Sequence, residues 1–432
     1  MGRIEQKEFD AVRTAREGGR PCIQIPDIID IFLRPAFGPD AAIFIYGMRI
    51  FLKTGNQTSA RTQWDGLVLV IAYSRKDRSG VYGYLLTQQG QKLEPLKDPR
   101  TGKPLREDDL TGYVAKLLKD AEAGYTASTL AKELYRALIK PFENELRDRD
   151  LILVPVGIMR QIPFAMLSDG TEDKDGRPIP MAAKYPFKIV ASLSSLRLLR
   201  QAKKHLRRGT KRLLAVGRPI NDKRPDDGRG RKKRRPLNRA RWDGGSPWTD
   251  LESSEVEVKR LMKLFGNRAT VYTRDKVKKP IIMKERWDRY DYLHFACHGD
   301  PGMTDREPAA LILSTYEDPA RIKKIAGPDA EITYTDILNQ RTPNALVVLS
   351  ACESARGKSE GGDIYSLARA FQGAVARAVA ATLWQIDDFI HAFYRRLLDG
   401  QSAGAAMLAS QRDYQKNGHP PRVWAPWIVI GE

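Results

Sequence analysis

Two apolar runs in the sequence each lead to a reactive side chain. Residues 290–296 lead to His298, and residues 346–349 lead to Cys352. A thiol beside an imidazole is used in nucleophilic catalysis, because the imidazole takes the proton of the thiol and later gives it to the leaving group. If both runs are strands of one parallel sheet, their carboxyl ends lie at the same edge, so the side chains can meet although 54 positions separate them. The sequence therefore predicts His298 and Cys352 as a catalytic dyad.

The same residue types have two rival uses. His294 and His298 are four residues apart, which on a strand separates them by roughly 13 Å, too far to share one metal ion. The three cysteines, Cys22, Cys297 and Cys352, match no zinc-binding spacing and are too few for a closed disulfide set, so reduced thiols and no metal are expected. For His294 and Cys297, inside the first run, an ordinary place in the core is favoured, since cysteine is among the residues most often buried.

The strands that would position the dyad are predicted by continuous apolar runs. These runs do not alternate with polar residues, which is typical of strands buried on both faces of a parallel sheet with helices on each side. They are residues 151–156, 187–191, 213–216, 290–296, 346–349 and 375–383. Two further β-rich runs, 67–73 and 81–87, surround a polar turn and predict a hairpin. The expected fold class is therefore α/β with a mostly parallel central sheet.

Amphipathic helices are predicted between these strands. Apolar residues recur every four positions over 128–147, with a kink at Pro141. A second helix is expected to open with a capping box made by Thr249 and Glu252. A third is expected to carry Ile364 in its apolar stripe. These helices would cover the faces of the sheet.

The chain carries a formal net charge of +20, and most of it lies in one short segment. Between residues 200 and 242 the lysines and arginines outnumber the aspartates by 15, with five basic residues in a row at 231–235. Such a run repels itself and cannot bury apolar surface, so an exposed loop over 223–245 is predicted. Three interpretations stay open for it: an inert solvated insertion, a site for nucleic acid or another acidic partner at 223–241, or a segment that the protein cuts itself.

Two observations bear on where the chain works. No apolar run reaches the roughly 18 residues that a membrane helix requires, so no membrane partner is expected. The first ten residues contain no apolar signal core, which favours the cytoplasm. Reduced thiols agree with that location.

A series of short motifs, taken together, resembles the CHAT family of caspase-like cysteine peptidases, relatives of separase and the caspases. They are Leu-Val-Pro at 153–155, Ile-Pro-Phe-Ala at 162–165, Ser-Leu-Ser-Ser-Leu at 192–196, His-Phe-Ala-Cys-His-Gly at 294–299, Ser-Ala-Cys-Glu-Ser at 350–354, Leu-Ala-Arg-Ala-Phe at 367–371, Leu-Trp-Gln-Ile-Asp-Asp at 383–388 and Trp-Ala-Pro-Trp at 424–427. Their agreement in order over most of the chain is specific, whereas a lone His-Gly pair would be weak evidence.

The resemblance implies a caspase-like three-layer α/β/α fold with a mostly parallel central sheet, preceded by a small N-terminal segment. Residues 61–222 would form an N-terminal, pseudo-caspase-like half and residues 246–432 the catalytic half, with the basic loop of 223–245 between them. Residues 1–60 have no assigned role. Family members often carry tetratricopeptide repeats that receive an activating signal, so the resemblance implies a regulatory protein partner acting in trans, or that role for residues 1–60.

The resemblance also implies a mechanism at the dyad. The thiolate of Cys352 would attack the scissile carbonyl of a protein substrate, and His298 would protonate the leaving amine. The backbone N–H groups of Gly299 and Cys352 would hold the oxyanion. Hydrolysis would then need only water, with no cofactor.

The first specificity pocket is expected around Ser350, Trp384, Asp387 and Asp388. Ser350 stands two residues before the nucleophile, where caspase-like enzymes place a pocket residue, and in separases an Asp after a motif comparable to that of Trp384 receives an arginine. A carboxylate at Asp387 or Asp388 would favour a basic residue before the cut. The alternative is that the two aspartates cap a helix over 389–399, and the interpretations weigh about evenly, with Asp387 slightly favoured as a pocket residue.

Two functions are consistent with these patterns. The leading one is a cysteine endopeptidase that cleaves a protein substrate and is activated by a partner. The alternative is a nucleic-acid-binding or adaptor protein on an inactive caspase-like scaffold, which the concentration of charge in the basic segment would explain.

Overall fold

The computed structural model describes most of the chain after residue 66. It covers residues 67–73, 80–87, 91–124, 129–146, 150–191, 209–221, 248, 250–300, 309–318, 320–321, 323–325, 327–343, 345–350, 358–360, 363–365, 367–383 and 389–431. The predicted N-terminal segment, residues 1–60, and the basic loop of 223–245 lie outside the described residues.

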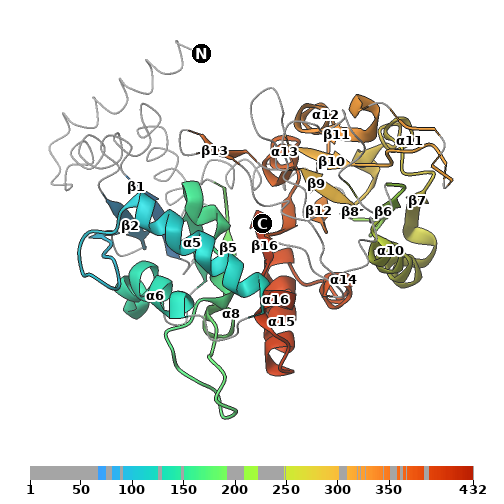
Figure 1. Cartoon of the computed structure of the whole chain (residues 1–432). Helices are drawn as coiled ribbons and strands as arrows, with labels where there is room; N and C mark the ends of the chain where they lie inside the picture. Colours follow the sequence, from blue (N-terminus) through green and yellow to red (C-terminus); the bar gives the residue numbers. More distant parts are fainter. Residues whose placement is uncertain are drawn as a thin grey trace, which may run out of the picture.

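One central sheet of 11 strands runs through the molecule in the order β3-β2-β1-β4-β5-β16-β15-β12-β8-β6-β7 (Figure 1). Its strands are β1 (Leu67–Tyr73), β2 (Val81–Leu86), β3 (Gln91–Pro95), β4 (Leu151–Pro155), β5 (Phe187–Ile189), β6 (Leu213–Pro219), β7 (Ala269–Arg274), β8 (Tyr292–Ala296), β12 (Leu346–Leu349), β15 (Ala378–Thr382) and β16 (Trp427–Gly431). Neighbours are antiparallel at β1–β2, β2–β3 and β15–β16 and parallel everywhere else. The predicted hairpin and the mostly parallel α/β sheet are confirmed.

Helices lie over this sheet, and most follow the predicted periodicity. The described α-helices are α5 (Glu107–Glu122), α6 (Thr129–Leu138), α7 (Glu143–Leu146), α8 (Met181–Lys184), α10 (Glu252–Phe265), α11 (Lys279–Ile282), α12 (Tyr334–Leu338), α13 (Leu367–Gly373), α14 (Ile390–Leu398), α15 (Ala403–Lys416) and α16 (Pro421–Trp424). The kink expected at Pro141 is a 3-10 turn, Lys140–Phe142, between α6 and α7, because proline cannot donate the helical hydrogen bond. Within the described ranges, no helix combines the length and apolarity needed to cross a membrane.

The predicted capping box is wrong. Helix α10 begins at Glu252 with Leu251 in the cap position, and no side chain bonds the cap. Thr249 lies outside the described residues. The chain just before the helix is held instead by Asp250, whose Oδ1 accepts a hydrogen bond from the backbone of Asn221 at 2.9 Å. This contact with a distant segment delays the start of the helix by about one turn relative to the local pattern.

The helix expected around Ile364 is shorter than predicted. Ile364 lies in β14 (Asp363–Tyr365), which pairs antiparallel with β13 (Lys358–Glu360), and α13 begins only at Leu367. The apolar spacing of a helix fits this segment, but pairing with a neighbouring strand decides its first residues.

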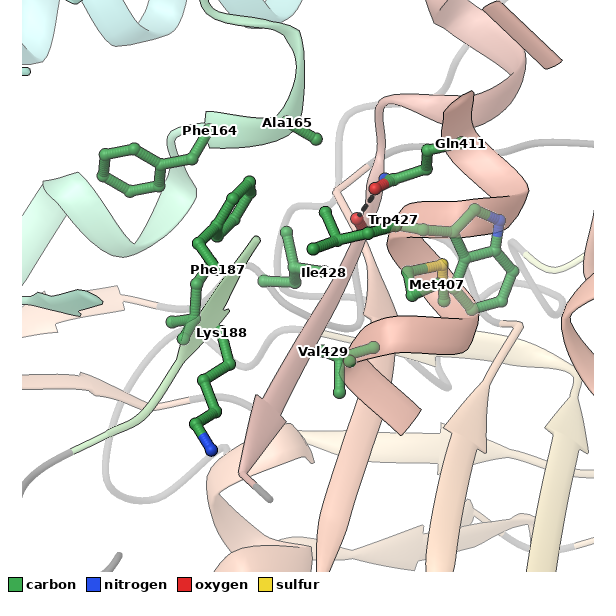
Figure 2. Close-up of a pocket in the computed structure, with 12 residues that line it drawn as sticks. Phe164, Ala165, Phe187, Lys188, Met407, Gln411, Trp427, Ile428 and Val429 are labelled. Atoms are coloured by element: carbon green, nitrogen blue, oxygen red, sulfur yellow. Dashed lines mark hydrogen bonds between the residues drawn. The ribbon is translucent and has the colours of Figure 1, made fainter. Parts of the chain in front are cut away.

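The two ends of the sheet meet at a narrow seam. β5 and β16 are joined by one register pair, Ile189 with Ile430. Beside it, β5, β16 and α15 surround a largely apolar cavity of about 20 Å³ (Figure 2), with room for about one water molecule. Gln411 on α15 lines this cavity and donates from Nε2 to the carbonyl oxygens of Trp424 and Trp427, both at 3.0 Å. The cavity is a packing gap too small for a ligand.

A second, smaller sheet follows directly from β8. Its strands are β9 (His298–Asp300), β10 (Ala310–Ile312) and β11 (Glu331–Thr333), in the order β11-β10-β9. In Figure 1 this small sheet lies beside the strands of the second half of the central sheet, next to α12 and α13. It was not predicted, because three-residue strands leave almost no periodic signal in a sequence.

Candidate active site

The carboxyl ends of β8 and β12 lie side by side, and both candidate residues follow them. The two strands are parallel neighbours, and their last register pair is Phe295 with Leu349. His298 and Cys352 are each the third residue after their member of that pair. Since neighbouring strands are about 4.8 Å apart, two chains that leave them in step start from adjacent points.

His298 opens strand β9, with only Cys297 between it and the end of β8. Cys297 is fully buried, as predicted for a core residue. Strand β9 pairs with β10, placing Leu311 opposite Gly299, so the backbone around His298 is held by the large sheet on one side and the small sheet on the other. The indole ring of Trp248 lies against the imidazole, with ring centroids 5.2 Å apart. Two sheets and one aromatic ring therefore restrict this half-buried histidine.

Four of the predicted site residues lie outside the described part of the chain, so their roles stay predictions. They are Cys352, Trp384, Asp387 and Asp388. Helix α14 begins at Ile390, and Phe389 occupies its cap position without a side-chain cap bond. Neither aspartate is therefore the cap residue of this helix, which weakens the capping alternative.

Ser350 follows β12 directly, and its hydroxyl has a partner on a helix. Its Oγ donates to Oε2 of Glu257 on α10 at 3.1 Å. The other carboxylate oxygen, Oε1, lies 3.1 Å from Nε2 of His294, although the two atoms are not aligned as a hydrogen bond. His294 is fully buried in β8, as predicted, and its Nδ1 lies 3.2 Å from the hydroxyl of Tyr394 on α14. Ser350 is thus the outer member of a polar chain that reaches into the core.

The inner end of this chain is electrostatically simple. Burial raises the pKa of Tyr394 well above its ordinary value, and the negative charge of Glu257 raises that pKa further. The phenol therefore stays protonated and can donate to Nδ1 of His294, which leaves the ring proton on Nε2, facing the carboxylate. The rings of Phe265 and Tyr292 lie around Tyr394, with centroids 5.6 and 5.9 Å from it. A proton on each contact thus satisfies the chain without a second buried charge.

The two ends of the basic segment are joined by described residues. Arg321 donates from Nε to the carbonyl oxygen of Asn221 at 2.7 Å and forms an ion pair with Asp250 through Nη2. Arg321 has a left-handed φ of 59°, which a non-glycine residue holds only when its contacts enforce it. Trp248, two residues before Asp250, is the residue that contacts His298. The chain therefore returns from the basic segment directly onto the candidate histidine.

Sequence reasoning missed Trp248, Glu257 and Tyr394. Glu257 is one of several glutamates on an amphipathic helix, and Tyr394 belongs to the apolar stripe of another, so neither has a local signal. One signal was available: a histidine inside an otherwise apolar strand must find polar partners, because burying an unpaired polar group costs free energy. Among the described residues, no cluster of three or more His, Cys, Asp or Glu side chains could hold a metal ion.

The sheet order and the strand-end histidine define an α/β protein of the caspase-like class. A model of the CHAT domain matches residues 128–432. The chain belongs to the CHAT domain family, and the resemblance derived from its motifs is confirmed.

Two curated relatives are tetratricopeptide repeat protein 28 of Homo sapiens and that of Mus musculus. The human protein is 27% identical over 351 residues, which cover 69% of this chain and 13% of the relative. The mouse protein is 25% identical over 389 residues, which cover 78% of this chain and 14% of the relative. The chain spans about one seventh of the length of these relatives.

A solved structure of Saccharomyces cerevisiae separase in complex with securin has a similar fold. Its TM-score with this chain is 0.53, at 10% sequence identity, and the match covers 94% of this chain and 33% of the other. At this identity the likeness concerns the fold alone.

Proposed function

We propose that this protein is a cysteine endopeptidase with Cys352 as the nucleophile and His298 as the general acid and base. The observation that carries the proposal is the register of β8 and β12. Each candidate residue is the third one after a shared register pair of two parallel neighbours. Membership of the CHAT domain family and the fold shared with separase support a peptidase scaffold.

In the proposed reaction, His298 takes the proton from Sγ of Cys352, and the thiolate adds to the carbon of the scissile carbonyl. Backbone N–H groups, for which Gly299 and Cys352 are the candidates, donate hydrogen bonds to the resulting oxyanion. The C–N bond then breaks while His298 gives its proton to the leaving amine. Water, deprotonated by His298, attacks the thioester and restores the thiol.

The proposed specificity is for Arg or Lys before the cut bond. Asp387 or Asp388, after Trp384, would supply the carboxylate that pairs with a basic side chain. The cap position of α14 belongs to Phe389, which leaves both aspartates available for this role. Ser350 would line the pocket through its small size, since its hydroxyl already donates to a carboxylate of the protein.

The decisive experiment measures cleavage of fluorogenic peptides and candidate protein partners by four proteins. They are the parent, Cys352→Ala, His298→Ala and, as a matched control, Cys22→Ser. The parent and Cys22→Ser should cleave after Arg or Lys in preference to Ala, and both dyad variants should lose activity. Mapping every fragment, including any cut within 223–241, reports the preferred residue before the cut and tests the self-processing interpretation of the basic loop. Full activity in Cys352→Ala would refute the proposal.

A regulatory protein partner is part of the proposal. The solved separase is bound to securin, and the curated relatives are tetratricopeptide repeat proteins. For this chain we expect a partner acting in trans, or residues 1–60, to control the site. Work in the cytoplasm would keep the nucleophile reduced.

Binding of an acidic partner such as nucleic acid is a second candidate function, and a groove in the described residues favours it. The groove has a volume of about 450 Å³ and is lined by Arg212, Lys284, Arg286 and Arg289, among others. The guanidinium of Arg212 lies 5.3 Å from the ring centroid of Tyr290. Because Arg212 and Tyr290 precede β6 and β8, this groove is at the edge of the sheet opposite to the candidate dyad.

Salt dependence distinguishes the two functions. If the groove and the basic segment hold nucleic acid, binding of a single-stranded oligonucleotide should weaken steeply with salt. It should also weaken on removal of 223–241 and in an Arg212→Ala, Arg289→Ala double variant. Such binding in a protein without thiol-dependent cleavage would favour the inactive-scaffold alternative, whereas both properties together would describe a peptidase controlled by nucleic acid.

A further inference from the structure

Four polar side chains from four elements form a continuous chain behind the candidate site. Ser350 contacts Glu257, Glu257 contacts His294, and His294 contacts Tyr394. The last two are fully buried, and the side chain of Glu257 is 21% exposed. Buried polar and charged groups commonly stabilise a fold no better than apolar side chains of the same volume. Stability alone is therefore a poor explanation for this arrangement.

Glu257 is the member that contacts both strands of the candidate dyad. One carboxylate oxygen faces His294, which precedes His298 by four residues on the same chain segment. The other oxygen accepts the hydroxyl proton of Ser350, two residues before Cys352. A single carboxylate on α10 thus links the segment of the base to the segment of the nucleophile.

The backbone ladder between these strands stops short of both candidate residues. In the described residues its last register pair is Phe295 with Leu349. After this pair β8 leads into β9, which belongs to the other sheet, and β12 ends. The hydrogen bond from Ser350 holds the first residue past the ladder. Geometry at a reacting centre is sensitive to such anchors, since a misplacement of about 1 Å can lower a rate about 100-fold.

We propose that Glu257 is a positioning residue for the nucleophile, acting through Ser350 and held in place by His294 and Tyr394. This inference rests on the proposed peptidase function. Glu257 would not touch the substrate; it would fix the start of the segment that carries Cys352. Its loss should therefore lower kcat and leave KM nearly unchanged, because the interaction matters for the chemical step and not for binding.

The experiment compares Glu257→Gln with Glu252→Gln, both in a Cys22→Ser background. Glutamine keeps the shape of Glu257 but removes its charge. Glu252 is a matched control, because it lies on the same helix with a side chain that is 81% exposed and 3.8 Å from its ion-pair partner Arg218. The measured quantities are kcat and KM for an arginyl peptide, and the rate at which iodoacetamide alkylates Cys352 between about pH 5 and pH 9. Cys297 is fully buried and should not compete.

We expect Glu257→Gln to lower kcat about tenfold, to change KM by less than about twofold and to slow alkylation at neutral pH. Glu252→Gln should match its parent in all three. Ser350→Ala, which removes only the hydroxyl held by the carboxylate, should lower kcat in the same direction, and it decides the question if Glu257→Gln does not fold. A kcat unchanged in both Glu257→Gln and Ser350→Ala would overturn the positioning role.

Alkylation separates this outcome from failure of the proposed function. A parent that shows no turnover, and whose thiol reacts at mildly acidic pH no faster than a small thiol of ordinary pKa, would remove the dyad and the role of Glu257 with it. A reactive parent thiol that Glu257→Gln leaves unchanged would keep the dyad and remove only the positioning inference.

Discussion

The two halves of the central sheet both contain parallel strands, but they finish them differently. In the first half, β4 runs into a 3-10 turn, Gly157–Gln161, and the side chain of Arg160 folds back to donate to the carbonyl oxygen of Pro155 at 3.1 Å. In the second half, β8 and β12 lead to His298 and to the Ser350 contact with the helix. The same edge of one sheet is closed by packing in the first half and carries polar side chains with chemical potential in the second.

Buried polar residues follow the same division. Within the described part of the first half they are Asp98 and Ser168. Within the described part of the second half they are Asn221, Ser254, Glu255, His294, Asp300, Ser314, Thr315, Thr342, Thr382, Ser410 and Gln411. Because each such group needs a partner to offset its desolvation, the second half is specified by polar contacts as well as by apolar packing.

The largest expected contrast is between His298 in the second half and Arg160 in the first. His298→Ala should lower kcat/KM about 10³-fold, since a positioned acid and base contributes about that factor. Arg160→Ala, at the end of a comparable strand, should change kcat/KM by less than about twofold. Peptide hydrolysis, with circular dichroism as a check on folding, measures both. Equal losses would erase the functional distinction between the halves.

Acid stability should depend more on Glu255 in the second half than on Glu143 in the first. Burial alone would raise the pKa of Glu255, but hydrogen bonds from Lys259, Arg218 and Arg274 lower it from 4.5 to about 2. The folded pKa lies below the unfolded one, so this stabilisation is present above about pH 4.5 and is lost as the pH falls toward 2. It amounts to at most about 3 kcal/mol.

Urea unfolding at about pH 5 and about pH 3 tests this expectation. Glu255→Gln should remove most of the difference in unfolding free energy between the two pH values. The pKa of Glu143 is also lowered, against the effect of burial, by Lys140 and Tyr135, and Glu143→Gln should have the smaller effect. A larger effect at Glu143 would reverse the comparison.

The seam between the halves should weaken in Gln411→Leu. This substitution removes the two hydrogen bonds to the carbonyl oxygens of Trp424 and Trp427 and should lower the free energy of unfolding by about 2 kcal/mol. The exposed Gln401, just before the same helix, serves as the control, and Gln401→Leu should leave the free energy of unfolding nearly unchanged. Indistinguishable urea midpoints would show that apolar packing alone holds the seam.

The smallest expected effect concerns Trp248, which belongs to the second half. Trp248 packs on Ala310 and Ile312 and faces His298, so Trp248→Leu should lower kcat/KM about fivefold through a less restricted imidazole. Trp248→Phe keeps an aromatic face and should recover most of this loss. If leucine and phenylalanine behave alike, the ring contact does not position the histidine.

Local sequence patterns were sufficient for the strands and for the edge where chemistry would lie. The strands β1 and β12 occupy the predicted residues, and β4, β5, β8 and β15 lie within the predicted runs. An unbroken apolar run that must be buried on both faces has few alternatives to an inner parallel strand, so its carboxyl end, and with it the place of His298, can be read from the chain. Predictions failed at Thr249 and Ile364, where contacts with other segments decide the start of a helix.

The partners of the site residues depended on tertiary structure. A histidine in an apolar strand predicted a buried His294, but not that Glu257 and Tyr394, from two helices far away in the sequence, would lie within about 3 Å of its ring nitrogens. Apolar periodicity specifies which face of a helix is buried and not where along the sheet the helix docks. A polar contact requires that position to within a fraction of an ångström, which only the packed core provides.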